Sequence, residues 1–210
     1  MPTAASTTSP AGNAAALLAG SQWADAAPGG RTTITYSFIG TGSTYSAASG
    51  GFQATASSLS EADRATTRKV LSNIEAVCGV TFVEVADNGG SAGVLRYGYS
   101  QRPNDMGFAG YAFYPSPADI GGDIWIGKAQ AGAEWDHYRP GLILHETLHA
   151  LGLKHPFEGV VTLPADDDDT AHTLMSYTHD GGPHADYAPY DVAALRFLYG
   201  GDGLGGARGD

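Results

Sequence analysis

The chain contains a single cysteine, Cys78, among its 210 residues, so it cannot form a disulfide within itself. Basic residues are also scarce: 11 Lys and Arg stand against 22 Asp and Glu, and the formal net charge is −11. This balance argues against nucleic acid and anionic membrane surfaces as partners. No apolar run approaches the ~20 residues that span a bilayer. The first twenty residues lack a basic n-region, so we predict no N-terminal signal peptide.

The length favours one domain, which a long cleft could divide into two lobes. Residues 1–12 are rich in Thr, Ser, Ala and Pro, and we expect them to be disordered. Residues 13–200 form the predicted domain, and residues 201–210 are a glycine-rich tail. Cys78 follows apolar residues at helical spacing, which favours a small buried hydrophobic residue over a nucleophile.

Hydrophobic periodicity predicts an α+β fold. A capping-box pattern at Ser60–Asp63 predicts the start of a long helix that continues to Cys78. The strand of residues 80–85 is apolar on both faces and is expected to be buried. Helices are also predicted at residues 13–23, from near Pro140, and at 189–199, with strands at 32–39, 94–99, 108–114 and 123–127.

One stretch carries a metal-binding pattern, H-E-x-x-H-x-x-G-x-x-H, from His145 to His155. Residues four apart share a helix face, so His145 and His149 can point at one ion. Gly152 can end the helix because glycine adopts left-handed backbone cheaply, and the chain can then return His155 as a third ligand. Three protein ligands plus a water are typical of catalytic zinc. Glu146, beside the first ligand, can then act as general base on the water.

A second half of the pattern lies downstream, at Thr173–Tyr177. A zinc motif of this kind followed by a methionine turn is the metzincin signature. The flanking residues make the chain similar to serralysins, the bacterial secreted metzincins, from about Leu17 to Gly200. The similar segments are His155–Pro156, Met175–Tyr177, Asp191–Leu195 with Leu198–Gly200, Thr35–Phe38 and Gly122–Ile126.

The resemblance implies a zinc endopeptidase with a twisted, mostly antiparallel-edged sheet and helices above the cleft and a small loop-rich C-terminal lobe below it. It implies that Tyr177 is a distant metal ligand at rest, which moves to hydrogen-bond the reaction intermediate; the alternative is a core tyrosine with a satisfied hydroxyl. Met175 is expected as an apolar floor beneath the histidines. The resemblance also implies secretion and admits a proteinaceous inhibitor as a partner.

The chain departs from the family at two places. Leu148 stands where the family usually has glycine, so packing behind the helix must differ. The tail contains no complete calcium-binding nonapeptide, so calcium is not expected to be essential. The aspartate run Asp166–Asp169 favours a solvated loop over a cation site.

Substrate is expected to bind along the strand Gly122–Gly127, where an extended peptide could add through backbone hydrogen bonds. The alternative for this segment is an ordinary interior strand. Of the remaining histidines, His137, His172, His179 and His184, only His179 is near enough to the methionine turn to line the cleft. A different class of function stays open, a zinc-holding peptide-binding module with little turnover. The intact Glu146 argues against it.

Overall fold

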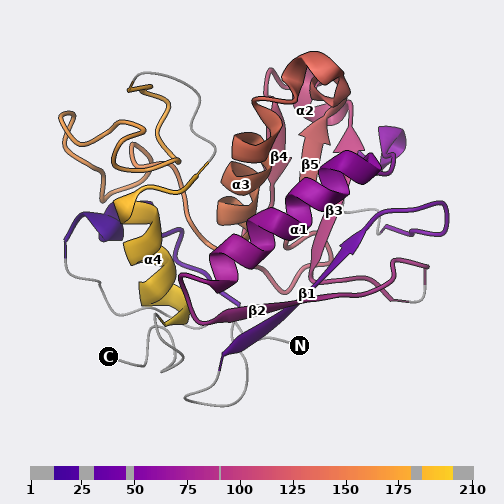
Figure 1. Ribbon diagram of the computed structural model, residues 1–210, viewed down its shortest axis with the longest axis horizontal. Helices are drawn as coiled ribbons and strands as arrows, with labels where there is room; N and C mark the ends of the chain where they lie inside the picture. Colours follow the sequence, from indigo (N-terminus) through magenta and orange to yellow (C-terminus); the bar gives the residue numbers. More distant parts are fainter. Residues whose placement is uncertain (1–11, 24–30, 46–49, 90, 181–185, 201–210) are drawn as a thin grey trace.

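The computed structural model describes residues 12–23, 31–45, 50–89, 91–180 and 186–200, and the predictions for residues 1–11, the tail 201–210 and His184 lie outside them. The fold is mixed α/β, with one five-stranded sheet in the order β2-β1-β3-β5-β4 (Figure 1). Neighbouring strands are parallel except β4, which pairs antiparallel with β5 at one edge. The strands are β1 Thr32–Phe38, β2 Val80–Glu84, β3 Leu95–Ser100, β4 Gly110–Ala112 and β5 Asp123–Gly127.

Four α-helices lie within the described residues. In Figure 1, α1 runs diagonally across the strands and α3 stands beside β4, while α4 lies to one side with the irregular segment that follows α3. No helix among these residues has both the length and the apolar composition needed to cross a membrane. The helices are α1 Glu61–Glu75, α2 Arg102–Asp105, α3 Arg139–Ala150 and α4 Pro189–Tyr199, with short 3₁₀ turns η1 Asn13–Leu17, η2 Phe52–Thr55, η3 Lys128–Ala131 and η4 Ala133–Trp135.

Strand alternation divides the hydrophobic residues between two cores. On β5, Ile124 and Ile126 face the main core with residues of α1, α3 and α4, while Trp125 packs on the opposite face with Phe52 and Ile39. Leu148 of α3 is fully buried in the main core. The leucine before His149 therefore contributes to the core against which α3 packs.

Three predicted elements differ from the structure. The segment of residues 13–23 forms only η1, and β2 is an edge strand with Val83 exposed, so it is not buried on both faces. Helix α1 begins as predicted, with the Ser60 hydroxyl accepting a hydrogen bond from the backbone N–H of Asp63. Its predicted capping box is incomplete, however, because the Asp63 carboxylate instead accepts hydrogen bonds from Tyr99 and Arg139.

The N-terminal segment packs against the end of α3. The backbone carbonyl of Ala150 accepts a hydrogen bond from Trp23 Nε1 at 2.8 Å, and that of Gly152 accepts one from the backbone N–H of Ala19 at 2.8 Å. The Tyr199 hydroxyl of α4 donates to the carbonyl of Leu151 at 2.6 Å. Because the last carbonyls of a helix have no partner within it, these donors fix the point where α3 ends and the chain turns.

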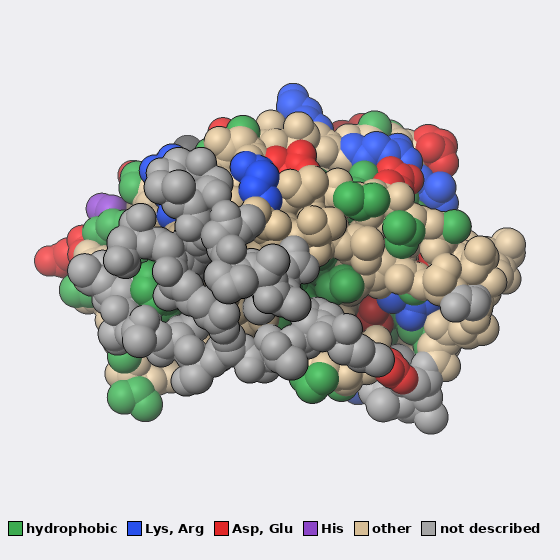
Figure 2. Space-filling view, turned by 90° about the horizontal axis from the view of Figure 1, so that it is seen from below, with side chains coloured by type: hydrophobic (Ala, Val, Ile, Leu, Met, Phe, Trp, Pro, Cys, Tyr) green, Lys and Arg blue, Asp and Glu red, His purple; other side chains and the backbone are tan. Residues whose placement is uncertain are grey.

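Acidic and basic side chains are interspersed along one margin of the face shown in Figure 2, and the described residues there do not gather into a basic patch.

Candidate metal centre and catalytic site

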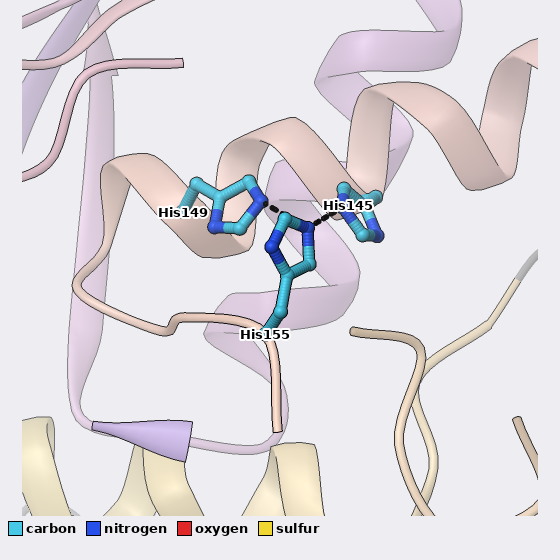
Figure 3. A group of neighbouring side chains, drawn as sticks. All are labelled: His145, His149 and His155. Atoms are coloured by element: carbon cyan, nitrogen blue, oxygen red, sulfur yellow. Dashed lines mark hydrogen bonds between the residues drawn. The ribbon is translucent and has the colours of Figure 1, made fainter. Parts of the chain in front are cut away.

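Helix α3 presents two of the predicted ligands on one face, and the following loop returns the third (Figure 3). His155 Nε2 lies 3.3 Å from His145 Nε2 and 3.1 Å from His149 Nε2. All three rings therefore point one nitrogen at a common centre. These are the only three His, Cys, Asp or Glu residues that form such a group among those described.

The turn after α3 requires glycine for two reasons. Gly152 has a φ of +105°, in the left-handed region, and a β-carbon there would lie 2.2 Å from the Ser21 carbonyl oxygen. Any other residue would be strained at this φ, and its β-carbon would clash with the Ser21 carbonyl oxygen. The predicted role of Gly152 in ending the helix is thus confirmed, and the turn brings His155 back to the face that His145 and His149 share.

The second ring nitrogen of each histidine faces an oxygen acceptor. His145 Nδ1 lies 3.0 Å from the Leu174 carbonyl oxygen, and His149 Nδ1 lies 2.8 Å from that of Leu153. His155 Nδ1 lies 2.9 Å from Glu158 Oε1. Since an oxygen acceptor needs a proton on the nitrogen, each neutral ring carries its proton on Nδ1. The three Nε2 lone pairs are then left facing one another.

This donor set fits a zinc ion. Ligand nitrogens ~2.0–2.1 Å from a tetrahedral zinc lie about 3.3 Å from each other, close to the 3.3 Å and 3.1 Å that separate His155 Nε2 from the other two Nε2 atoms. Burial, with a smaller contribution from the neighbouring His155, lowers the pKa of His145 to about 4, and burial lowers the pKa of His149 as well. Both rings are therefore neutral near pH 7, the form in which imidazole binds a metal. Three converging lone pairs with no proton between them favour a cation at their centre.

Glu146 lies beside this centre on α3 and is almost fully buried. Burial raises the pKa of its carboxyl to about 8. A β-carbon on Gly110 of β4 would lie 2.6 Å from Glu146 Oε1, so the edge strand of the sheet passes directly over the carboxylate. A cation at the three Nε2 atoms would favour the ionised form, because an opposite charge at short range lowers the pKa of a carboxyl.

Tyr177 is not a core residue. It is 58 % exposed, and its ring lies 4.6 Å from that of His155 and 6.3 Å from that of His145, measured between centroids. Met175, two residues earlier, is fully buried in the main core. The turn therefore separates an apolar, buried residue from a phenol that stands in the cleft beside the histidines.

Two cavities adjoin His145, Glu146 and Tyr177. The first, of about 370 Å³, reaches toward Tyr138, Leu142 and Leu174, with His179 among its lining residues. The second, of about 400 Å³, is lined by His149, His155 and a group of aromatic side chains, Phe108, Tyr111, Tyr114 and Phe157. His179 thus lines the cleft, as the sequence predicts.

The predicted substrate strand needs a correction. Strand β5, which contains Gly122–Gly127 except for its first residue, pairs with β3 on one side and β4 on the other, so it has no free edge. The alternative of an interior strand is the correct one. The edge belongs to β4, Gly110–Ala112, which also lines the second cavity. Glycines and apolar alternation indicate a strand but do not reveal its position in the sheet, which depends on long-range pairing.

The aspartate run lies in irregular structure, as predicted. Asp169 accepts hydrogen bonds from the backbone of Ala171 and His172 and contacts His172 Nδ1 at 2.8 Å, while Asp167 accepts one from Asn13. These contacts hold the loop in place: some lie within its own turn, and one comes from the N-terminal segment.

Three contributors to the site had no signal in the motif. Glu158 follows His155 by three residues, and the backbone carbonyls of Leu153 and Leu174 support the other two ligands. Glu158 could have been noted as a carboxylate close to a ligand, because such residues often orient histidines. The two carbonyls could not, since every residue has one and only the fold selects which of them faces a ring.

Comparisons with models of known protein families and with curated proteins found no match for this chain.

Proposed function

We propose that the chain is a zinc-dependent endopeptidase of the metzincin type, similar to serralysins, with a two-lobed catalytic domain. The observation that carries this proposal is the convergence of three histidines, with His155 Nε2 at 3.3 Å and 3.1 Å from the other two Nε2 atoms and all three ligand atoms within 4.8 Å of one another, beside a buried glutamate and an open cleft. The residue order from His145 to Tyr177 adds support, because it combines the zinc motif with a methionine turn. Secretion remains an expectation drawn from the resemblance.

His145, His149 and His155 would hold the metal. When bound, zinc supplies Lewis acidity and lowers the pKa of a coordinated water toward ~7. Glu146 is placed to accept the proton from the attacking water and to deliver it to the leaving amine, which is general acid–base catalysis. Its burial keeps bulk water from competing for that proton.

Tyr177 would stabilise the oxyanion. Its ring contacts His155 and Phe157, and it lies at the border of the two cavities. A phenol hydroxyl that reaches the substrate oxygen as negative charge develops would favour the transition state over the ground state. The resemblance implies that the same hydroxyl would be a distant ligand of the metal at rest.

The substrate would be an extended peptide that adds to the free edge of β4. Backbone hydrogen bonds to residues 110–112 would place the peptide across Glu146, with side chains entering the two cavities. Because such bonds do not depend on side chains, we expect broad sequence tolerance, and a proteinaceous inhibitor could occupy the same edge. Calcium is not expected to be required.

The decisive experiment measures cleavage of a quenched fluorescent peptide mixture before and after treatment with a zinc chelator. We expect cleavage to be abolished by the chelator and restored by one equivalent of zinc, with a calcium-selective chelator as the control that leaves it intact. Stoichiometric zinc without any peptide cleavage would instead support the alternative, a zinc-holding peptide-binding module. Full activity after exhaustive removal of metal would refute both.

A further inference from the structure

The three histidines are not supported in the same way. His145 and His149 belong to α3, and their Nδ1 atoms face backbone carbonyls. His155 lies in a loop, and its Nδ1 faces a side chain, Glu158 Oε1 at 2.9 Å. The third ligand therefore depends on a contact that a single substitution can remove, and on the conformation of the loop that carries both residues.

Lys154, the residue directly before His155, holds that loop in place. Its ammonium donates to the backbone carbonyls of Glu158 at 2.6 Å and Val161 at 3.1 Å. It also donates to the backbone carbonyl of Ala16 in the N-terminal segment. Among the described residues it forms no ion pair with a carboxylate, so its charge is directed at main-chain oxygens, much as a bound cation would be.

The backbone of Lys154 is tied to the same segment. Its N–H donates to the Leu17 carbonyl at 2.7 Å, next to the bridge between Leu18 and Leu153. The contacts thus form a continuous path from the N-terminal segment through Lys154 to the backbone of Glu158, and from the Glu158 carboxylate to the ring of His155. Phe157 stacks on the His155 ring, with 5.2 Å between the ring centroids and 4° between the ring planes.

We propose that Glu158 and Lys154 are positioning residues for the third metal ligand: Glu158 fixes the tautomer and orientation of His155, and Lys154 acts through the backbone of Glu158. This inference rests on the proposed zinc function and extends it to residues outside the zinc motif. It makes the geometry of the metal centre depend on the N-terminal segment, which has no residue in the site.

The proposal predicts a loss of metal affinity rather than a loss of fold. Removing an outer-shell partner of a metal-binding histidine typically weakens metal binding about 10–100-fold. Glu158→Leu keeps about the size of the side chain and removes the oxygen that accepts from His155, and Lys154→Met keeps most of the aliphatic stem and removes the ammonium. Because both changes act on one path, the double variant should lose less than the product of the two single losses.

The experiment titrates zinc into the metal-free proteins in competition with a chromophoric chelator. We expect each single variant to bind zinc about 10–100-fold more weakly than the parent, with the melting temperature of the metal-free protein little changed. Glu134→Leu and Lys69→Met are the matched controls, because both residues are exposed and far from the loop in sequence; they should bind zinc like the parent. Parental affinity in both Glu158→Leu and Lys154→Met would overturn the proposal while leaving the zinc function intact.

A measurement on the metal-free parent keeps the test independent of how the variants fold. Ring ¹⁵N NMR should show His155 protonated at Nδ1, and Glu158→Ala should shift that ring toward a mixture of tautomers without affecting His145. Protonation of His155 at Nε2 in the parent would contradict the proposal. If the parent binds no zinc at any concentration, the failure lies with the proposed function itself.

Discussion

The Asp191 carboxylate accepts a hydrogen bond from the backbone N–H of Leu174 at 2.8 Å, and the carbonyl of Leu174 accepts one from His145 Nδ1 at 3.0 Å. Asp191 is fully buried at the start of α4 and also accepts hydrogen bonds from the Thr173 hydroxyl at 2.6 Å and the Ala188 N–H at 2.8 Å. One buried side chain therefore connects the last helix and the turn that contains Met175 to His145, the first of the three histidines.

Replacing Asp191 by Ala should destabilise the protein and loosen the turn. Three donors would lose their acceptor, two of them buried, and each unsatisfied buried group costs about 1–3 kcal/mol. We expect the free energy of unfolding of the metal-free protein to fall by about 3 kcal/mol or more, measured by urea denaturation. Asp186→Ala is the control, because Asp186 is exposed and bonds only the N–H of the next residue. A change of under about 0.5 kcal/mol for Asp191→Ala, as for an ordinary surface site, would contradict this account.

The sequence predicts the metal centre better than it predicts the cleft around it. The histidine spacing depends on helix geometry and on one glycine, which are local properties, and the structure brings His145, His149 and His155 together as predicted. Strand β5 shows the limit. Its bounds are predicted to the residue, yet its interior position follows from pairing with β3 and β4, which no local pattern encodes.

Side-chain networks show the same limit. Asp63 fits the third position of a capping box, but its carboxylate pairs with Arg139 of α3 at 2.6 Å and accepts from Tyr99. The capping-box rule predicts that this carboxylate accepts from the backbone N–H of Ser60. In the fold, the buried guanidinium of Arg139 takes that place. Glu158 is similar, because its proximity to His155 in sequence permits a contact that only the loop conformation makes.

Glu146→Gln should separate metal binding from catalysis. The three histidines remain, so zinc content should equal that of the parent, while the loss of the general base should lower kcat by at least ~10²-fold. His149→Ala is the comparison that should lose both metal and activity. Zinc content and steady-state peptide cleavage are measured on the same samples. Cleavage by Glu146→Gln at the parental rate would mean that another group takes the proton.

Asp123 should make the stability of the protein depend on pH. It is fully buried on β5, and neither carboxylate oxygen has a hydrogen-bond partner among the described residues. Burial raises its pKa to about 7, with Arg96 acting in the opposite direction. Because the folded pKa lies above the unfolded value of 3.8, the folded state binds more protons between these two values. The contribution of Asp123 to stability is therefore present below pH ~4 and is lost as the pH rises through about 7.

The matched variant is Asp123→Asn, which has the same shape and cannot ionise. We expect the difference in melting temperature between variant and parent to shift in favour of the variant as the pH rises from 5 to 8. Thermal denaturation of the metal-free proteins at several pH values measures this difference. A constant difference across that range would show that Asp123 is ionised in the folded state throughout.

Tyr177→Phe tests whether the exposed phenol acts in catalysis. The ring would keep its contacts with His155 and Phe157, and the three histidines would still bind zinc, so metal content should not change. If the hydroxyl stabilises the oxyanion, its removal affects the transition state alone, and kcat and kcat/KM should fall together with KM nearly constant. Loss of one such donor costs about 10²–10³-fold in kcat at comparable sites. Steady-state peptide cleavage with zinc measured on the same sample gives both quantities. An unchanged kcat with zinc present would remove Tyr177 from the catalytic residues and leave its ring only as part of the cleft wall.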